Sequence, residues 1–489
     1  MSLPSSVGLP NEMMLGNLDY SIPPDAKSFS VKVQPSNLSS IVSSTYTMPA
    51  ATTYLGDVAF PSQNIIFDLP CGASPSTFLD SRFTTLNYQM TVTVTTAGNA
   101  ATTHFDGYLR SGAYSFFDRV YLTGQNGQII EDIGEYGLVN DTLCALQMSN
   151  SVRDGIANQY GFLSETGVSS QGHKINILSS GQQATAGQSE THSYSIPLCS
   201  GVVGVLADKF LNIGRTSKLQ VVLQTSSILP LTLGTNAFTA TGDQFTVTLS
   251  NFSIQCEYVD IGINALNMLD QTLVDGKSYI HGITYRTSSA TLPATSGTAS
   301  LLAGIRASSV KSLFARFVDG GVSNAANSLN GKYDSKSPML NGINFNVGGI
   351  KYPQTPINPL LAPSQAFRET QMAIGSFNNS QFTSSIVPSQ YCKLSAGGTT
   401  ASYAVGGTQE YSWNTGTAVS AQAQFIFGEN MEVCARRGLL SGLNCTSAPI
   451  FVEMNIATAP TNTHTCYVIG MLDHVVIHDV RSGDIQVRI

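Results

Sequence analysis

The chain has 489 residues, which is too long for one ordinary domain and fits two or three domains that each bury a core. Charged residues make up only 11% of it, against about 25% in an average soluble domain, so much of its surface must be uncharged loop or contact with other subunits. The net charge is -7, and the 24 lysines and arginines form no run that could neutralise phosphates, which argues against nucleic-acid packaging by a basic arm.

Residues 1–57 are interpreted as an N-terminal arm. The segment contains prolines and has no charged stretch followed by an apolar one, so we expect no secretory signal. No apolar run of the chain reaches the roughly 18 to 20 residues of a membrane span. A short helix in the arm could contact a neighbouring subunit or face an inner layer, and a disordered terminus is the equal alternative. The candidate contact residues are Met13, Met14, Leu15 and Leu18.

Alternation of apolar and polar residues dominates the rest of the chain and predicts half-buried β-strands. It occurs in residues 83–96, 117–123, 218–225, 244–259 and 466–480. Clusters of Gly, Asn, Ser and Thr separate these segments, and few stretches have helical spacing. The pattern therefore predicts an all-β protein of antiparallel sheets with Greek-key or jelly-roll connections, in which helices are inserts.

The stretch FFDRVYLTGQNGQIIEDIGEYG (116–137) predicts a β-hairpin followed by a helix. Its Gly-Gln-Asn-Gly segment permits a positive φ and reverses the chain. Apolar residues at 136, 139, 143 and 146 then predict an amphipathic helix that lies against a sheet edge. The same order of strand, glycine turn, strand and helix returns at 341–375, so we predict two copies of one β unit, 58–262 and 263–489.

Two long stretches, 150–190 and 376–412, have no strong periodicity. They occupy similar relative positions in the two predicted units, after the helix and before the last strands. Loops of this length in compact domains are usually functional or exposed, so we predict long loops here.

Four stretches together resemble the major capsid proteins of the double jelly-roll lineage, which includes tectiviruses, adenoviruses, large nucleocytoplasmic DNA viruses, virophages and Polinton-like viruses. They are the hairpin and helix at 116–146, the Ile-Pro-Leu strand and its connection at 194–225, NGINFNVGGIKYPQTPI at 341–357, and LLSGLNCTSAPIFVEMNIA at 439–457 with the closing strands. The Ser-Gly-Leu-Asn and Tyr-Pro-x-x-Pro-Ile elements resemble the virophage and Polinton-like branch. The small residues of CSGVVGV, after Ile-Pro-Leu, depart from the bulkier pattern of the large viruses.

The resemblance implies an all-β fold of two tandem eight-stranded antiparallel jelly rolls with short helical inserts, long loops and an N-terminal arm. It also implies a structural major capsid protein of an icosahedral double-stranded DNA virus, whose trimers form pseudo-hexagonal capsomers that tile the shell. The expected partners are further copies of the chain, neighbouring capsomers, penton and minor capsid proteins. The expected location is the virion, assembled inside the host cell. Neither a cofactor nor sequence-specific nucleic-acid contact is expected, and contact with an inner membrane stays open.

No residue pattern predicts catalysis or metal binding. His474 and His478 would form a metal pair on a helix, but they lie in an alternating segment. On a strand they are about 13 Å apart at roughly 3.3 Å per residue, too far for one ion. The Gly-Lys-Ser sequence at 276–278 lacks the preceding glycine of a phosphate loop, and no Gly-x-Ser-x-Gly motif occurs. We therefore predict a protein without enzymatic activity.

The adjacent Arg436 and Arg437 are predicted to contact a neighbouring subunit, because two charges add little affinity for nucleic acid at physiological salt. Two other functions stay open. One is a trimeric virion vertex or receptor-binding β-sandwich protein that recognises a surface glycan through the long stretches, and the other is an enzyme on a jelly-roll scaffold. The seven dispersed histidines argue against the enzyme, and duplication across nearly the whole chain favours the capsid tile.

Overall fold

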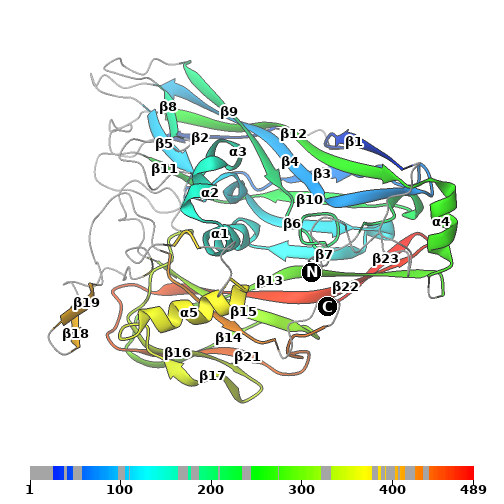
Figure 1. Ribbon diagram of the computed structural model, residues 1–489. Helices are drawn as coiled ribbons and strands as arrows, with labels where there is room; N and C mark the ends of the chain where they lie inside the picture. The colour runs from blue at the N-terminus through cyan, green and yellow to red at the C-terminus, as the bar shows by residue number, and fades with distance from the viewer. Residues whose placement is uncertain are drawn as a thin grey trace, which may run out of the picture.

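The computed structural model describes most of the chain between residues 26 and 489. The described residues are 26–37, 41–47, 58–96, 105–109, 111–162, 174–177, 187–207, 210–233, 244–273, 275–320, 332–376, 384–386, 391, 402–405, 408–412, 424–432 and 440–489. Within them the strands form two units, one above the other in Figure 1. No helix in this part of the chain is both long and apolar enough to cross a membrane.

Two antiparallel sheets build the first unit. The first sheet has the order β1-β12-β4-β9, with β2 also beside β12, and the second has the order β3-β10-β6-β7. Their bounds are β1 (Lys27–Val33), β2 (Val42–Thr47), β3 (Asn64–Asp68), β4 (Thr77–Thr96), β6 (Phe117–Thr123), β7 (Ile129–Gly134), β9 (Ser189–Pro197), β10 (Gln220–Thr225) and β12 (Gln244–Asp260). Alternation explains the sheets: in β12, Phe245, Val247 and Leu249 are buried while the threonines between them remain partly exposed.

Two further antiparallel sheets build the second unit. The third sheet has the order β13-β22-β15-β20, with β23 also beside β22, and the fourth has the order β14-β21-β16-β17. Their bounds are β13 (Lys277–Leu292), β14 (Gly297–Ala303), β15 (Val310–Asp319), β16 (Leu340–Val347), β17 (Ile350–Ile357), β20 (Ile426–Asn430), β21 (Ile450–Ile456), β22 (His464–Asp479) and β23 (Asp484–Arg488). Most residues of β15 are buried on both faces, which places this strand in the interior of the whole molecule.

Both units connect their strands in the same way. Counted within each unit, with β1 and β2 together as the first strand, the sheet orders are 1-8-3-6 and 2-7-4-5. This is the jelly-roll order of an eight-stranded double sheet. The prediction of two tandem eight-stranded antiparallel jelly rolls is confirmed. Beyond this frame lie a small sheet of β11 (Leu231–Leu233), β5 (Phe105–Leu109) and β8 (Lys174–Ile177), and a hairpin of β18 (Ser402–Val405) and β19 (Thr408–Ser412).

A helix follows the fifth strand of each unit, as the repeated strand, turn, strand and helix order predicts. α1 (Tyr136–Gln147) follows β7, and α5 (Pro363–Ile374) follows β17. The predicted turn between β6 and β7 is η3 (Gln125–Gly127), where Gly127 has a φ of 73°. The other helices are η2 (Ala113–Phe116), α2 (Asn150–Gly155), α3 (Ala157–Tyr160), η4 (Ile213–Arg215) and α4 (Gly262–Asp270).

Three predicted segments differ from the structure. Part of the predicted arm, 1–57, belongs to the first jelly roll, because β1 pairs with β12 from Lys27 to Val33 and β2 pairs with β12 from Val42 to Thr47. Phe29, Val31 and Val33 of β1 do alternate with polar residues, but over only seven residues, and β2 (VSSTYT) contains few apolar residues, so neither segment stood out from the surrounding polar sequence. The stretch 150–190 is not all loop, because it contains α2, α3, β8 and the first residues of β9. The stretch 376–412 is not all loop either, because it contains β18 and β19. The division of the chain at 262/263 stays a prediction, and α4 lies at this position.

Candidate functional site at the seam between the units

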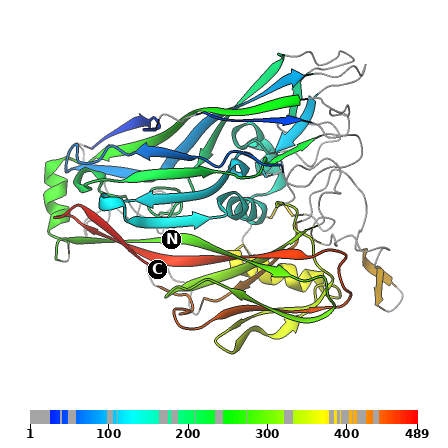
Figure 2. The same ribbon diagram turned by 180° about the vertical axis from the view of Figure 1, so that it is seen from behind.

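The two jelly rolls meet along a seam of packed elements. We define the seam as β7, α1 and residues 198–207 and 210–217 of the first unit together with β13, β15, β22, β23 and residues 332–335 of the second. β7 runs beside β13, as Figures 1 and 2 show from opposite sides. A bridge between Ala207 and Gly282 joins the two units, and one cluster of buried apolar side chains runs through both. The two cores are therefore continuous.

Helix α1 is buried on all sides in the seam. All its residues from Tyr136 to Leu146 are buried, including the polar Asn140, Asp141 and Thr142. The predicted helix is confirmed, and it is buried on its polar face as well as on its apolar face. The second unit covers the face that sequence reasoning left exposed, and that face carries the polar residues that bond across the seam.

The first of these bonds is a buried ion pair between Arg316 of β15 and Asp141 of α1. Arg316 Nη1 lies 2.6 Å from Asp141 Oδ2, and the two side chains are 0% and 2% exposed. The same Nη1 donates to Thr142 Oγ1 at 2.9 Å, and Nη2 donates to the Tyr333 carbonyl at 3.1 Å. Because a buried charge is costly without its partner, this pair fixes α1 against β15.

A second charged group, Lys332, reaches the first unit from the connection between β15 and β16. Its Nζ lies 2.9 Å from Asp118 Oδ1 and also pairs with Glu135, the residue before α1. Burial alone would lower the pKa of Lys332, but the negative groups around it, Glu135 and Asp118 among them, outweigh burial and raise that pKa. Lys332 therefore stays protonated and ties the end of β7 and the start of β6 to the second unit.

The carboxylate of Glu131 on β7 accepts hydrogen bonds from three donors, which lie on both sides of the seam. Its Oε1 accepts hydrogen bonds of 2.8 Å from Thr284 Oγ1 of β13 and from the Gly201 amide, and its Oε2 accepts one from Ser200 Oγ. Glu131 is 3% exposed, so these donors replace water around the carboxylate. The carboxylate thus links β7, residues 200 and 201, and β13.

His474 of β22 fills a slot between two glycines from different units. Its Nε2 lies 3.1 Å from the Gly201 carbonyl. A Cβ on Gly282 would lie 2.6 Å from His474 Cε1, and one on Gly201 would overlap the same ring. Burial lowers the pKa of His474 and so favours the neutral ring, which donates from Nε2 to the carbonyl. The ring therefore fills the space between Gly201 and Gly282 and makes one hydrogen bond from the second unit to the first.

A short part of the second long stretch also crosses the seam. The Ser385 amide donates to the Ala145 carbonyl at 3.0 Å, and Ser384 Oγ donates to the same oxygen at 2.8 Å. Arg153 of α2 in turn donates from Nη1 to Ser385 Oγ at 3.1 Å. Residues 384–386 therefore tie the helices of the first unit to the second unit.

Taken together, the buried polar groups give the seam one favoured arrangement. An apolar interface tolerates sliding, whereas each of these charges loses its partner if the units shift. The seam can therefore hold two jelly rolls as one rigid body. The carboxylates of Asp141, Asp118 and Glu131 all take part in these bonds, and no group of three or more metal-ligating side chains occurs in the described part of the chain.

Solved structures with this architecture come from viruses. The chain is similar to the Faustovirus major capsid protein, with 10% identity, coverage of 92% of this chain and 90% of that chain, and a TM-score of 0.52. It is similar to the mavirus major capsid protein, with 11% identity, coverage of 100% and 95%, and a TM-score of 0.51. A chain of the Sputnik virophage structure gives 14% identity, coverage of 91% and 88%, and a TM-score of 0.51. The chain has the double jelly-roll fold of these capsid proteins. No family model and no curated protein matches the sequence.

The predicted contact residues of this double jelly-roll chain lie outside the described residues. This holds for Arg436 and Arg437 and for the arm residues Met13, Met14, Leu15 and Leu18. The two histidines that we interpreted as strand residues do lie on β22, where His474 pairs with Gly282 and His478 with Ser278. The strand interpretation is confirmed.

Sequence reasoning missed the residues that join the two jelly rolls. Arg316 interrupts the apolar run SLFARFV, and Asp141 interrupts LVNDTLCAL. A charged residue inside an apolar segment signals a buried pair, because such a charge is rarely buried alone. That signal could have marked both residues as buried, but not as partners of each other.

Proposed function

We propose that this double jelly-roll chain is the structural major capsid protein of an icosahedral double-stranded DNA virus. Three copies form a trimer with a pseudo-hexagonal outline, and these capsomers tile the shell of the virion. The fold shared with the Faustovirus and mavirus major capsid proteins supports this function. The protein works by assembly and not by catalysis.

The seam is the observation that carries the proposal. Three chains with two similar jelly rolls each place six units around a threefold axis, which gives a nearly sixfold outline. A tile of this kind transmits lateral force only if the two jelly rolls in a chain keep one mutual orientation. The buried Arg316–Asp141 pair and the Glu131 hydrogen bonds provide that constraint.

The outer face of the first sheet supports extensive contact with neighbours. Exposed hydroxyl groups on this face bond to one another across strands, for example Ser43 to Thr248 at 3.0 Å and Thr91 to Thr191 at 2.9 Å. Such a face carries few charges that must be desolvated when another subunit covers it, and its hydroxyls can bridge to interfacial water. The low charge of the whole chain has the same explanation.

We further propose that Arg436 and Arg437 form salt bridges to neighbouring subunits, and that the arm contacts neighbours through Met13, Met14, Leu15 and Leu18. Other expected contacts are neighbouring capsomers, penton and minor capsid proteins. An Arg436→Ala/Arg437→Ala variant should form trimers that dissociate more easily on dilution than the wild-type protein. If the variant and wild-type trimers dissociate equally, neither arginine contributes to the interface.

Copy number in purified particles tests the function against its main alternative. As the tile, the chain should be the most abundant protein by quantitative mass spectrometry. A scarce protein confined to the vertices would instead be the vertex or receptor-binding protein. Duplication over both halves of the chain favours the tile.

A further inference from the structure

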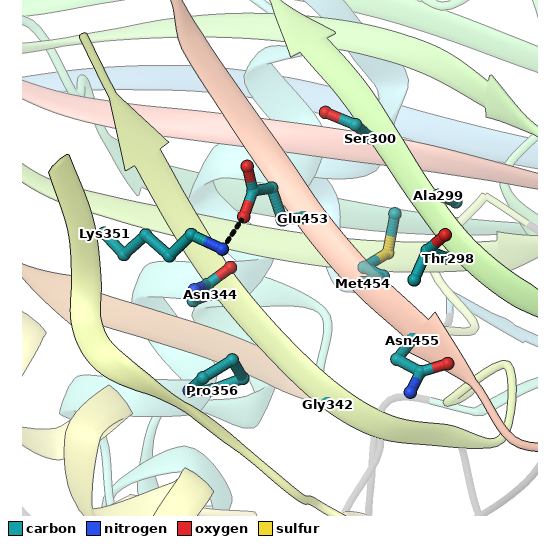
Figure 3. Close-up of a pocket in the computed structure, with 10 residues that line it drawn as sticks. All are labelled: Thr298, Ala299, Ser300, Gly342, Asn344, Lys351, Pro356, Glu453, Met454 and Asn455. Atoms are coloured by element: carbon teal, nitrogen blue, oxygen red, sulfur yellow. Dashed lines mark ion pairs between the residues drawn. The ribbon is translucent and has the colours of Figure 1, made fainter. Parts of the chain in front are cut away.

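A hollow of about 430 Å³ opens on the outer face of the fourth sheet, away from the seam. It lies over the strands β14, β21, β16 and β17, and Figure 3 shows its side chains projecting from all four. The polar residues in its lining are Thr298, Ser300, Asn344, Lys351, Glu453 and Asn455. Its volume is within the range of small-molecule sites.

The Tyr-Pro-Gln-Thr-Pro-Ile segment creates the hollow. Tyr352 pairs with Phe345 and Ile357 pairs with Ile343, so residues 353–356 of β17 stand opposite Asn344 alone. Extra residues in one strand of a pair bend that strand and leave its partner without a neighbour. β17 therefore bows away from β16, with Pro356 in the wall of the space above Asn344.

Asn344 is left with an unused donor. The side chain is 1% exposed, and its Nδ2 has no hydrogen-bond partner among the described residues. On the β21 side, Asn344 pairs with Glu453. On the β17 side it has no paired residue, because β17 bows away from β16 there. A buried amide without a partner costs stability, so the unpaired Nδ2 in the lining of the hollow points to an acceptor that binds there.

The charges in the hollow already balance each other. Lys351 Nζ lies 2.9 Å from Glu453 Oε2, and Asn346 Nδ2 donates to Glu453 Oε1 at 2.7 Å. These two bonds lower the pKa of Glu453 and keep its carboxylate charged. An anionic ligand would meet this carboxylate, and a cationic ligand would meet Lys351. The hollow therefore favours a neutral ligand.

An apolar surface continues from the hollow along the same face. Phe451 and Leu302 are cross-strand partners, as Glu453 and Ser300 are in the hollow, and they lie one row further along the strands. Leu302 is 56% exposed. A ligand that binds in the polar hollow can therefore also pack an apolar face against Phe451 and Leu302.

We propose that the hollow binds a hexopyranose unit of a neutral glycan. A pyranose carries uncharged hydroxyl groups that donate and accept, and its C–H face can pack on Phe451 and Leu302. One hydroxyl oxygen accepts from Asn344 Nδ2, and others bond to Ser300, Thr298 and Asn455. An extended peptide is less suited, because a peptide that adds a strand binds along a sheet edge, whereas the hollow lies on the face of the sheet.

Saturation-transfer NMR with the purified full-length protein tests this site. The probes are the methyl glycosides of glucose, galactose and mannose, and at least one of them should receive saturation from the wild-type protein. Ser300→Tyr should abolish the signal, because a large ring on exposed β14 fills the hollow. The matched control is Ser151→Tyr, on an exposed position of α2 in the first jelly roll, which should keep it.

Asn344→Leu separates a binding role from a structural one. It should weaken glycoside binding about tenfold, since one hydrogen bond is lost, and should raise the thermal midpoint, since a buried unpaired amide is removed. A lowered midpoint would show that Asn344 is a structural residue and would overturn the assignment. Absence of transfer from all three glycosides, or an equal signal from Ser300→Tyr, would also overturn it. If Ser300→Tyr instead breaks trimers, the hollow holds a second copy of the chain.

Discussion

Replacing Arg316 with methionine should destabilise the folded chain more than any exposed charge substitution. The substitution leaves the Asp141 carboxylate, 2% exposed, without its cation at 2.6 Å. Removing one partner of a buried pair costs about 3 to 5 kcal/mol. Arg119 provides the matched control, because it also pairs with an aspartate at 2.6 Å, but its side chain is 39% exposed and that of Asp132 is 42% exposed. Arg119→Met should cost less than about 1 kcal/mol.

The assay is urea unfolding followed by circular dichroism, with both variants and an Arg316→Met/Asp141→Leu double variant measured together. The double variant removes both charges and should recover most of the lost stability, since well-packed apolar replacements of a buried pair are often neutral. A loss for Arg316→Met no greater than for Arg119→Met would refute the argument. So would a double variant as unstable as the single one, because the cost would then not come from the unpaired carboxylate.

Three further predictions follow from buried groups. Gly201→Ala should lower the melting temperature by several degrees, since its Cβ would overlap the His474 ring, whereas Gly155→Ala, with no atom nearby, should not. Burial lowers the pKa of His478 to about 4, whereas a histidine in the unfolded chain has a pKa of about 6.5, so between these values the unfolded chain binds a proton that the folded chain excludes. The free energy of unfolding should therefore decrease as the pH falls from about 6.5 to about 4, by on the order of 3 kcal/mol. His478→Gln should reduce this loss in melting curves recorded across the same pH range. Burial and the neighbouring Glu369 raise the pKa of Glu429 from 4.5 to about 8, so between these values the folded chain holds a proton that the unfolded chain releases. The folded state should therefore lose stability as the pH rises from 4.5 to about 8. Glu429→Gln should raise the melting temperature at about pH 9 and leave it unchanged at about pH 4.

The jelly-roll frame could be predicted because its signals are local. Alternation within β4, β12 and β22 and the repeated strand, turn, strand and helix order depend only on neighbouring residues. β1 and β2 were missed because they are short, at seven and six residues, and their position in the sheet depends on pairing with the distant β12.

The seam could not be predicted because its partners are distant in the sequence. Arg316 and Asp141 are separated by 175 residues, and neither residue indicates the other. The hollow at Asn344 depends in the same way on the bow of β17, which the two prolines of Tyr-Pro-Gln-Thr-Pro-Ile suggest only after the register with β16 is known. The predicted contact residues Arg436 and Arg437 remain predictions.

The mass and shape of the native protein test the central claim most directly. Light scattering of the purified chain should give three times 51.9 kDa, and negative-stain images of the same sample should show hexagonal outlines. That result would agree with two rigidly joined jelly rolls in each of three subunits. A monomeric mass, or trimers without a pseudo-sixfold outline, would contradict the capsid tile.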